Sequence, residues 1–399
     1  MTAAGHHSQQ APADAPGSDH AGLSFSSNVP RHLVHRGALA EVLLTDWRRT
    51  GDGAYLCAAQ WPRGHSLYRV LDGHHDPLLA AETLRQTGIL LAHSAEGVPL
   101  DWKFVMDGMA ISVHPAGLRA GGAPADVLLE AGLSPLRKGT RSSAHLRLDV
   151  RFRHDGRVFA TGGARMRCVA PALYRRLRGE RAGAATRPAA VPPPVDARVV
   201  GMSTEADVVL GAALDRGAWP LRVRTEHPVL FDHPLDHVPG MLVFEGFRQA
   251  GRALLGLPGA QLTGCDVGFT RYLEFDPTPV VLARVRRRAA SGASLAVRVV
   301  QDGRTAVSGT VEVCARDSGA IAAQRRPPPT PRPSPAPSSA RSGAGPAAGV
   351  TTSRRSGRSP SAAGRRRSAG SARPCGPGRG RAAGRPTSPR PGGTGPAAW

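Results

Sequence analysis

The clearest hydrophobic pattern in the chain is an apolar run that carries three polar residues at helical spacing. After Pro239 and Gly240 the sequence MLVFEGFRQAGRALLGL is apolar on nearly every side, which predicts a buried helix. Glu245 and Arg248 are three residues apart, and Gln249 follows Glu245 by four, so the three side chains share one face. An ion pair on a solvated helix edge would also explain this spacing, and it stabilises a helix by only ~0.3–0.5 kcal/mol.

The same polar pattern occurs a second time in the N-terminal half. The sequence ETLRQTG aligns with EGFRQAG, which places Glu82, Arg85 and Gln86 opposite the three polar residues of the later run. The same alignment places His74 opposite His237 without a gap. Burying a charge costs several kcal/mol unless it is paired, so a buried ion pair is rarely retained for stability alone. The recurrence therefore favours a functional role over a solvated salt bridge.

The repeat extends on both sides of the two predicted helices. Residues 41–47 (EVLLTDW) align with residues 207–213 (DVVLGAA) upstream, and residues 148–168 align with residues 295–314 downstream. In each downstream segment an Asp-Gly pair separates two alternating stretches, which predicts a β-hairpin. Each half is therefore expected to contain a strand, a short segment, one long helix and several antiparallel strands.

This order of elements predicts an α+β fold. A single apolar helix followed by long antiparallel strands buries itself most readily against one face of their sheet, and two such sheets paired edge to edge would make an intramolecular pseudo-dimer. The predicted domains are residues 23–180 and 198–318, joined by a Pro-rich linker at residues 181–197. Residues 1–22 and 319–399 are expected to be disordered.

Composition separates the C-terminal tail from the rest of the chain. The 399 residues carry a formal charge of +22, but fifteen arginines lie between Arg325 and Arg390, which leaves the first 324 residues at +7. The tail is made almost wholly of Arg, Pro, Gly, Ala, Ser and Thr and cannot bury enough apolar surface to fold. It has no aromatic residue before Trp399 to stack a base, so we expect no specific nucleic-acid partner.

A frameshift would also produce such a tail. The chain has two lysines against fifty arginines, which is typical of a GC-rich gene, and a gene of that kind read out of frame yields the same residue set. Resequencing the 3′ end of the gene would decide between a functional basic arm and a frameshift product.

The cysteines and the N-terminus limit the compartment and the cofactors. The five cysteines include no C-x-x-C pair and no metal-ligand spacing, so they are interpreted as small buried residues in a reducing compartment, and no metal or other cofactor is predicted. The first 22 residues lack the apolar core of a signal peptide, and no run approaches the ~18 apolar residues of a membrane span. We expect a cytoplasmic protein without a membrane partner.

Candidate chemistry gathers just before the second predicted helix. His233 and His237, with Asp236 between them, precede the helix N-terminus, where free N–H groups and the positive end of the dipole can stabilise an oxyanion. A single histidine in such a place is usually a cap or a surface residue. The spacing matches no paired metal-ligand motif such as H-E-x-x-H, so an oxyanion or acid–base role is favoured over a metal site.

The stretch HPLDHVPGMLVFEGFRQAG resembles the hotdog-fold 3-hydroxyacyl-carrier-protein dehydratases, in which a His before a Pro-Gly turn and a Glu on the central helix form the site. Those positions correspond to His233 and Glu245. The tandem arrangement, with HHDPLLAAETLRQTGILLAH in the first half, is more similar to the A-factor (γ-butyrolactone) biosynthesis hotdog family of actinomycetes, over about Leu23 to Cys314. Val70 occupies the position of His233 in the first half, so a His–Glu dyad is expected in the second half alone.

The resemblance implies an acyltransferase. Members of that family move a β-ketoacyl group from an acyl carrier protein to a hydroxyl of dihydroxyacetone phosphate, and the phosphorylated ester goes on to a γ-butyrolactone signal that controls antibiotic production and differentiation. Such a transfer needs a base for the hydroxyl, stabilisation of a tetrahedral oxyanion and a cationic clamp for the phosphate. It needs no cysteine nucleophile.

Roles follow for the candidate residues. Glu245 or Glu82 is the candidate base, with a pKa raised by burial and lowered by the neighbouring arginine. Arg248 is the first candidate to hold the phosphate, because its fork matches phosphate oxygens. His233 and the amides after Gly240 would face the thioester oxygen. The remaining candidates for substrate binding are Arg85, His237, Gln249 and His74.

Two alternatives remain open. A dehydratase or thioesterase acting on acyl thioesters would use His233 and Glu245, and incubation with a β-ketoacyl carrier protein, with and without dihydroxyacetone phosphate, would distinguish it from a transferase. A non-catalytic regulator that binds an acyl chain or a lactone would use the same pocket and place the basic tail on DNA. The body shows no helix-turn-helix pattern, which disfavours this second alternative.

Overall fold

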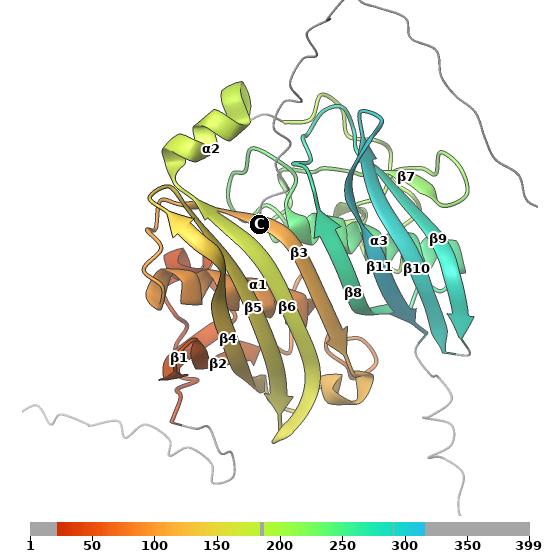
Figure 1. Ribbon diagram of the computed structural model, residues 1–399. Coiled ribbons are helices and arrows are strands. Elements are labelled where there is room, and N and C mark those ends of the chain that lie inside the picture. Colours follow the sequence, from red (N-terminus) through yellow and green to blue (C-terminus); the bar gives the residue numbers. More distant parts are fainter. Residues whose placement is uncertain (1–21, 184–186, 290, 316–399) are drawn as a thin grey trace, which may run out of the picture. The chain divides into compact units, whose positions relative to one another are not determined.

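One antiparallel sheet of eleven strands runs through both halves of the described chain (Figure 1). The computed structural model describes residues 22–183, 187–289 and 291–315, and all of these belong to one structural unit. The two segments predicted to be disordered, residues 1–22 and 319–399, fall outside those ranges apart from residue 22 itself. What the sequence indicates for the tail therefore stays a prediction.

The N-terminal half contributes six strands and two α-helices. Two strands precede the central helix α1, and four long strands follow it. The bounds are β1 Leu44–Gly51, β2 Ala54–Trp61, α1 Leu78–Ser94, β3 Lys103–Val113, β4 Ala125–Thr140, β5 Ser143–His154, β6 Arg157–Val169 and α2 Pro171–Arg178, with 3-10 helices at Arg31–Val34, Leu39–Glu41, Pro115–Leu118 and Gly179–Arg181.

The C-terminal half repeats this plan with a shorter start. Its elements are a 3-10 helix at Glu205–Asp207, β7 Ala218–Pro220, α3 Gly240–Leu255, β8 Gln261–Phe269, β9 Val280–Ala289, β10 Gly292–Gln301 and β11 Arg304–Cys314. The expected first strand at residues 207–213 is wrong, because this segment forms only isolated bridges at Leu210 and Gly211. Its backbone is hydrogen-bonded instead by a side chain of α3, as described below.

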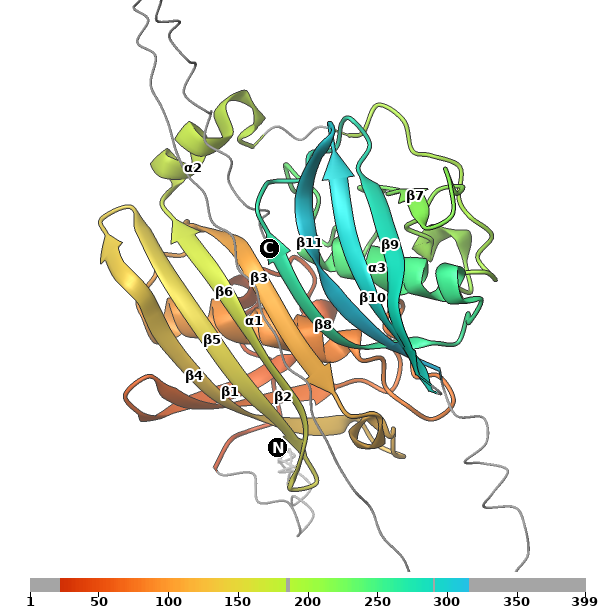
Figure 2. The same cartoon turned by 45° about the vertical axis from the view of Figure 1, so that its right-hand side comes forward.

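The two central helices lie against the same face of the sheet, as Figures 1 and 2 show. α1 packs against β3 and β6, and α3 packs against β9, β10 and β11. The strands present that face because their apolar residues alternate with polar ones. In β5, for example, Leu148 and Val150 are buried beneath the helix while Arg147 and Arg151 are exposed on the opposite side.

The two halves are joined at the centre of the sheet by β3 and β8. The strand order is β1-β2-β4-β5-β6-β3-β8-β11-β10-β9-β7, so equivalent strands succeed one another outward from this seam. Gly108 to Ser112 pair antiparallel with Gly264 to Gly268. The predicted α+β fold, with each long helix covered by an antiparallel sheet and the sheets joined edge to edge as an intramolecular pseudo-dimer, is confirmed.

Both predicted hairpins are present at equivalent places in the two halves. Asp155 and Gly156 connect β5 to β6 with φ values of 48° and 71°, and Asp302 and Gly303 connect β10 to β11 with 51° and 67°. Two successive residues in the left-handed region form the type I′ turn that two-residue hairpins favour. These turns set the register that brings β6 and β11 to the strands of the seam.

No helix in the described residues is long and apolar enough to cross a membrane.

Candidate active site

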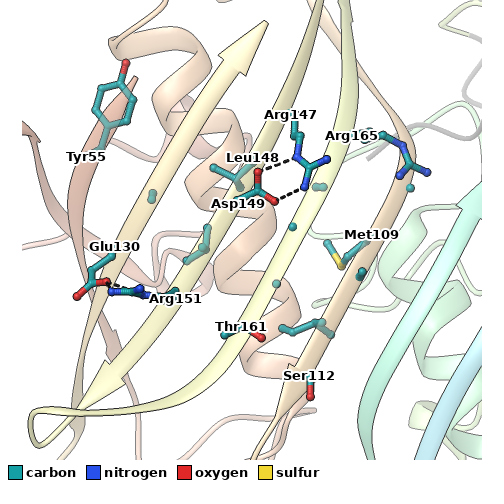
Figure 3. Close-up of a pocket in the computed structure, with 18 of the residues that line it drawn as sticks. Tyr55, Met109, Ser112, Glu130, Arg147, Leu148, Asp149, Arg151, Thr161 and Arg165 are labelled. Atoms are coloured by element: carbon teal, nitrogen blue, oxygen red, sulfur yellow. Dashed lines mark hydrogen bonds and ion pairs between the residues drawn. The ribbon is translucent and has the colours of Figure 1, made fainter. Parts of the chain in front are cut away.

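Two hollows formed by the described residues differ in their chemistry, and only the smaller of these two contains buried acid–base groups. The larger, about 940 Å³, lies on the outer face of the sheet (Figure 3). Four of its charged residues form pairs at the surface, Arg147 with Asp149 and Arg151 with Glu130, and α1 lies behind the sheet in that view. The second, about 670 Å³, is lined by residues of both halves and is called the cleft below.

The cleft is assembled from both halves of the chain. The N-terminal half provides residues 32–37, Arg85 on α1, residues 100–104 and the first part of α2, and the C-terminal half provides residues 229–241. The side chains that matter for chemistry are His35, Arg36, Arg85, Lys103, Arg175, Asp232, His233, Asp236 and His237. His233 and His237 precede α3 in the sequence, but in the cleft they lie with Arg85 of α1. The polar residues of α3 itself do not line the cleft.

The acid of α1 is buried and held by cations. Glu82 is 1 % exposed, which excludes the solvated-edge interpretation of the pair. Arg85 Nε donates to its Oε2 at 3.0 Å, and Arg36 forms a second ion pair with Oε1. Burial alone would raise the pKa of Glu82, but the Arg36 and Arg85 guanidinium groups lower it to about 2. Glu82 is therefore a fixed anion at neutral pH.

The acid of α3 has a different set of partners. Glu245 is 0 % exposed, and its two oxygens accept hydrogen bonds from Arg248 and, at 2.6 Å, from Gln249. The other end of the Arg248 guanidinium pairs with Asp76, which lies in the N-terminal half and accepts from the amide of Leu78 at the start of α1. Arg248 thus ties the two halves together and is not among the residues lining the cleft.

The glutamines of the two helices make the same contacts in each half. Gln86 accepts from the amide of Leu43 at 2.9 Å and donates to the carbonyl of Glu41 at 2.8 Å. Gln249 does the same at 2.9 and 2.8 Å with Val209 and Asp207. Each glutamine also donates to the glutamate of its own helix. These amides anchor the segment before each helix and link it to the buried glutamate, and the hydrogen bonds found for Gln249 all serve these two purposes.

His233 is oriented by the acid that precedes it. Its Nδ1 lies 2.5 Å from Asp232 Oδ1, and its ring, 37 % exposed, lines the cleft. Asp232 also accepts from the amide of Gly37 at 2.8 Å and pairs with Arg36 at 3.3 Å. Burial would raise the pKa of Asp232, but His233 and Arg36 hold it well below its usual range. Among the described contacts none joins His233 to Glu245.

His237 forms a second dyad of the same kind. Its Nδ1 lies 2.5 Å from Asp236 Oδ1, and its buried Nε2 has no hydrogen-bond partner among the described residues. Asp236 also accepts from the hydroxyl of Tyr174 on α2 at 2.7 Å. Burial would raise the pKa of Asp236, but the contact with His237 keeps this pKa well below its usual range. One carboxylate therefore orients His237 and fastens α2 beside the cleft.

Of the two remaining candidates, Gly240 lies at the wall of the cleft and His74 lies apart from it. Gly240 is the first residue of α3, and its neighbours Pro239 and Met241 both line the cleft, so the amides expected to face an oxyanion are at its wall. His74 hydrogen-bonds to the carbonyl of Asp72 at 2.9 Å and is not among the residues lining the cleft.

The described cysteines are poorly suited to nucleophilic chemistry. Cys57, Cys168 and Cys265 are buried, Cys314 is partly buried, and all four are free, as the sequence indicates. Burial raises the pKa of Cys168 and of Cys265 to about 12, so neither forms a thiolate at neutral pH. Within the described residues, no three His, Cys, Asp or Glu side chains gather as a metal ion would require.

Sequence reasoning missed several groups of the cleft. The two Asp-His dipeptides, at 232–233 and 236–237, were a visible signal that each histidine follows its own carboxylate. Arg36 and Lys103 lie in segments without helical or strand periodicity, so no pattern pointed to them. α2 had the signal of a proline at its first position, followed by alternating apolar and basic residues.

Comparison with known proteins gives a consistent picture. The family model described as AfsA, A-factor biosynthesis hotdog domain, matches residues 19–170 and 183–317. A 2-oxo-3-(phosphooxy)propyl 3-oxoalkanoate synthase of Streptomyces virginiae is 46% identical over 253 residues, which cover 63% of this chain and 85% of that protein. The synthase of the same name from Streptomyces coelicolor is 38% identical, over 69% of this chain and 88% of the relative.

Solved structures with a similar arrangement include a 12:0-ACP thioesterase from Umbellularia californica, at 13% identity and a TM-score of 0.40, covering 65% of this chain and 94% of that one. A hotdog-fold protein from Alicyclobacillus acidocaldarius matches at 17% identity and a TM-score of 0.35, over 72% and 99% of the two chains.

Proposed function

The chain belongs to the A-factor biosynthesis hotdog family, and on that premise we propose that it is an acyltransferase of γ-butyrolactone biosynthesis. It transfers a β-ketoacyl group from the thioester of an acyl carrier protein to the hydroxyl of dihydroxyacetone phosphate. The product is the kind of phosphorylated ester that the names of its relatives describe. The observation that carries the proposal is the cleft, in which a histidine–aspartate dyad faces a cluster of cations from the other half of the chain.

The phosphate of the acceptor is held by Arg85 and Lys103. Both line the cleft, and Arg85 keeps its Nη1 without a partner among the described residues while Nε and Nη2 bind Glu82. A guanidinium fixed on one side in this way presents its free edge to a phosphate at little cost in entropy. Arg248, the first candidate from sequence, is engaged by Asp76 and Glu245 and is replaced by Arg85 in this role.

Proton transfer is assigned to His233 instead of the two glutamates. Both oxygens of Glu82 and of Glu245 are occupied by guanidinium and amide donors, so neither acid reaches a substrate hydroxyl. The Asp232 carboxylate orients the His233 ring through Nδ1, which leaves Nε2 to deliver a proton to the thiolate as the C–S bond breaks. The amides at the start of α3, at Gly240 and Met241, stabilise the tetrahedral oxyanion.

Product analysis tests the transferase. We expect the protein to convert a β-ketoacyl carrier protein and dihydroxyacetone phosphate into the phosphorylated ester, detected by mass spectrometry, and to form none when the acceptor is omitted. His233→Gln should lower the rate by ~10²-fold or more, as the loss of a proton-transfer residue does. His114→Gln, at an exposed histidine on a 3-10 turn, is the control. Thioester hydrolysis or water loss without ester formation would overturn the proposal and favour the thioesterase or dehydratase.

A further inference from the structure

A second histidine of the cleft has a tautomer fixed by its neighbours. His35 Nε2 lies 2.9 Å from His93 Nε2, and His93 Nδ1 lies 2.7 Å from the carbonyl oxygen of Val98. A carbonyl only accepts, so His93 carries its hydrogen on Nδ1 and, when neutral, receives one at Nε2 from His35. The hydrogen of a neutral His35 ring is therefore on Nε2, and its Nδ1 is a lone pair.

The backbone and the packing hold this ring in place. His35 adopts a left-handed conformation, with φ 51° and ψ 54°, which costs a non-glycine residue on the order of 1 kcal/mol and is found disproportionately at functional sites. Phe104 packs edge-on at 5.0 Å between ring centroids. The ring is only partly buried and lines the cleft, Nε2 is the atom that faces His93, and Nδ1 is not among the buried polar atoms that lack a partner.

Burial and the basic groups around His35 keep it neutral in the free protein. These groups are His93 at the end of α1, Arg85 on α1, His233 from the C-terminal half and Lys103 at the start of β3. Burial and these groups together lower the pKa of His35 to about 3. His233 differs from His35 in its partner, because its Nδ1 meets the Asp232 carboxylate, whereas Nε2 of His35 meets another imidazole. A ring with a free Nδ1 lone pair is suited to accept a proton, and a ring whose Nδ1 is held by a carboxylate is suited to deliver one from Nε2.

We propose that His35 is the base that takes the proton of the acceptor hydroxyl, and that the phosphate of the acceptor switches this base on. The proposal rests on the function proposed above. The hydroxyl proton goes to His35 Nδ1 as the C–O bond forms at the thioester carbon. The C–S bond then breaks, and the thiolate takes a proton from His233 Nε2. The histidines return to their starting protonation states by exchange with solvent between turnovers.

The switch follows from where the phosphate is held. Arg85 and Lys103 are both the proposed phosphate ligands and two of the cations that disfavour a proton on His35. A bound phosphate dianion cancels their charge, so the basicity of His35 rises when the acceptor is in place. Water alone brings no such charge. The arrangement therefore protects the thioester from hydrolysis until the phosphorylated acceptor has bound.

Substitutions at His35 test the role of the base. His35→Asn tolerates the left-handed backbone and keeps a polar group near Nδ1, but it cannot take a proton. We expect kcat for ester formation to fall ~10²-fold or more, with the KM for dihydroxyacetone phosphate within about threefold of wild type. The acidic limb of the pH–rate profile should disappear as well. A kcat within about threefold of wild type, or an unchanged acidic limb, would overturn the assignment; His114→Asn is the matched control.

The wild-type protein tests the switch without any substitution. Transfer to dihydroxyacetone, which lacks the phosphate, should be slow and should accelerate at least ~10-fold when inorganic phosphate is added, because the anion occupies the same cations. Sulfate at equal ionic strength should act similarly and chloride should not. If phosphate inhibits transfer or leaves it unchanged, the switch is excluded. A wild-type protein that makes no ester even from dihydroxyacetone phosphate would instead refute the proposed function.

Discussion

The helices α1 and α3 carry the same three polar residues, but the two sets now do different things. Glu82 of α1 is bound by two guanidinium groups, Arg36 and Arg85, and both line the cleft. Glu245 of α3 is bound by Arg248, whose other edge is closed by Asp76 from the opposite half. The comparison teaches that a repeated motif marks a buried polar centre without saying which copy meets the substrate. The partners outside the repeat decide that.

The largest expected effect is a loss of stability at the polar centre of α3, where Arg248 lies between Glu245 and Asp76. Arg248→Met leaves Glu245 and Asp76 buried without their cation, and breaking a buried pair in this way costs about 3–5 kcal/mol in the free energy of unfolding. Urea denaturation followed by circular dichroism measures it. A loss below ~1 kcal/mol would show that the bridge between the halves is dispensable and that the two copies differ less than we infer.

The second-largest expected effect is a pH-dependent loss of stability at Glu82 of α1, the polar centre beside the cleft. The pKa of Glu82 is about 2 in the folded protein against an ordinary value of 4.5, so the stability it contributes is fully present above pH 4.5 and is lost as pH falls toward 2. Replacement by glutamine removes this contribution, at most about 3 kcal/mol. The difference between wild type and Glu82→Gln should therefore shrink between pH 4.5 and 2. A difference independent of pH would mean that Glu82 is not held as an anion.

A smaller effect on stability and a specific one on activity are expected for Arg85→Met. Glu82 keeps Arg36, so we expect a loss of stability well below that of Arg248→Met. The lost charged contact to phosphate should raise the KM for dihydroxyacetone phosphate ~10–100-fold, and it should affect dihydroxyacetone far less. Steady-state kinetics with both acceptors gives the answer. Equal losses for the two acceptors would remove Arg85 from the phosphate site.

The smallest expected effects should be equal in the two copies. Gln86→Ala and Gln249→Ala each leave a backbone N–H and a C=O of the preceding segment without a partner, which costs about 1–2 kcal/mol. Thermal unfolding of the two variants should give losses within ~0.5 kcal/mol of each other. A clear inequality would show that the copies have diverged even in their shared structural contacts.

Sequence patterns predicted the fold further than they predicted the site. The two helices and both Asp-Gly hairpins follow from local periodicity and turn chemistry, which act at short range. The edge-to-edge pairing was inferred from the repeat and joins strands that are far apart in the sequence. The site depends on contacts between residues distant in the sequence, such as Arg36 with Glu82 across 46 positions and with Asp232 across 196. A single sequence carries no record of those distances.

The glutamines illustrate the same limit. The spacing of both from the glutamates was visible, and Gln249 was interpreted as a substrate-binding residue because the segment that its amide binds lies forty residues earlier. The repeat did align Glu41 with Asp207, the carbonyl partners of the two amides. The alignment therefore contained the correct pairs, but only the structure gives the reason for them.

The seam between β3 and β8 lies within one polypeptide, and this has an evolutionary consequence. In a symmetric homodimer every substitution appears twice, so a change that improves one centre is also imposed on its twin. When the two copies lie in one chain, each copy can accumulate substitutions independently of the other. Here the polar centre of α3 ties the two halves together, while that of α1 lies at the cleft. The cleft contains His233 together with Arg85 and Lys103, and the chain did not have to carry a second histidine at the equivalent position, which is Val70.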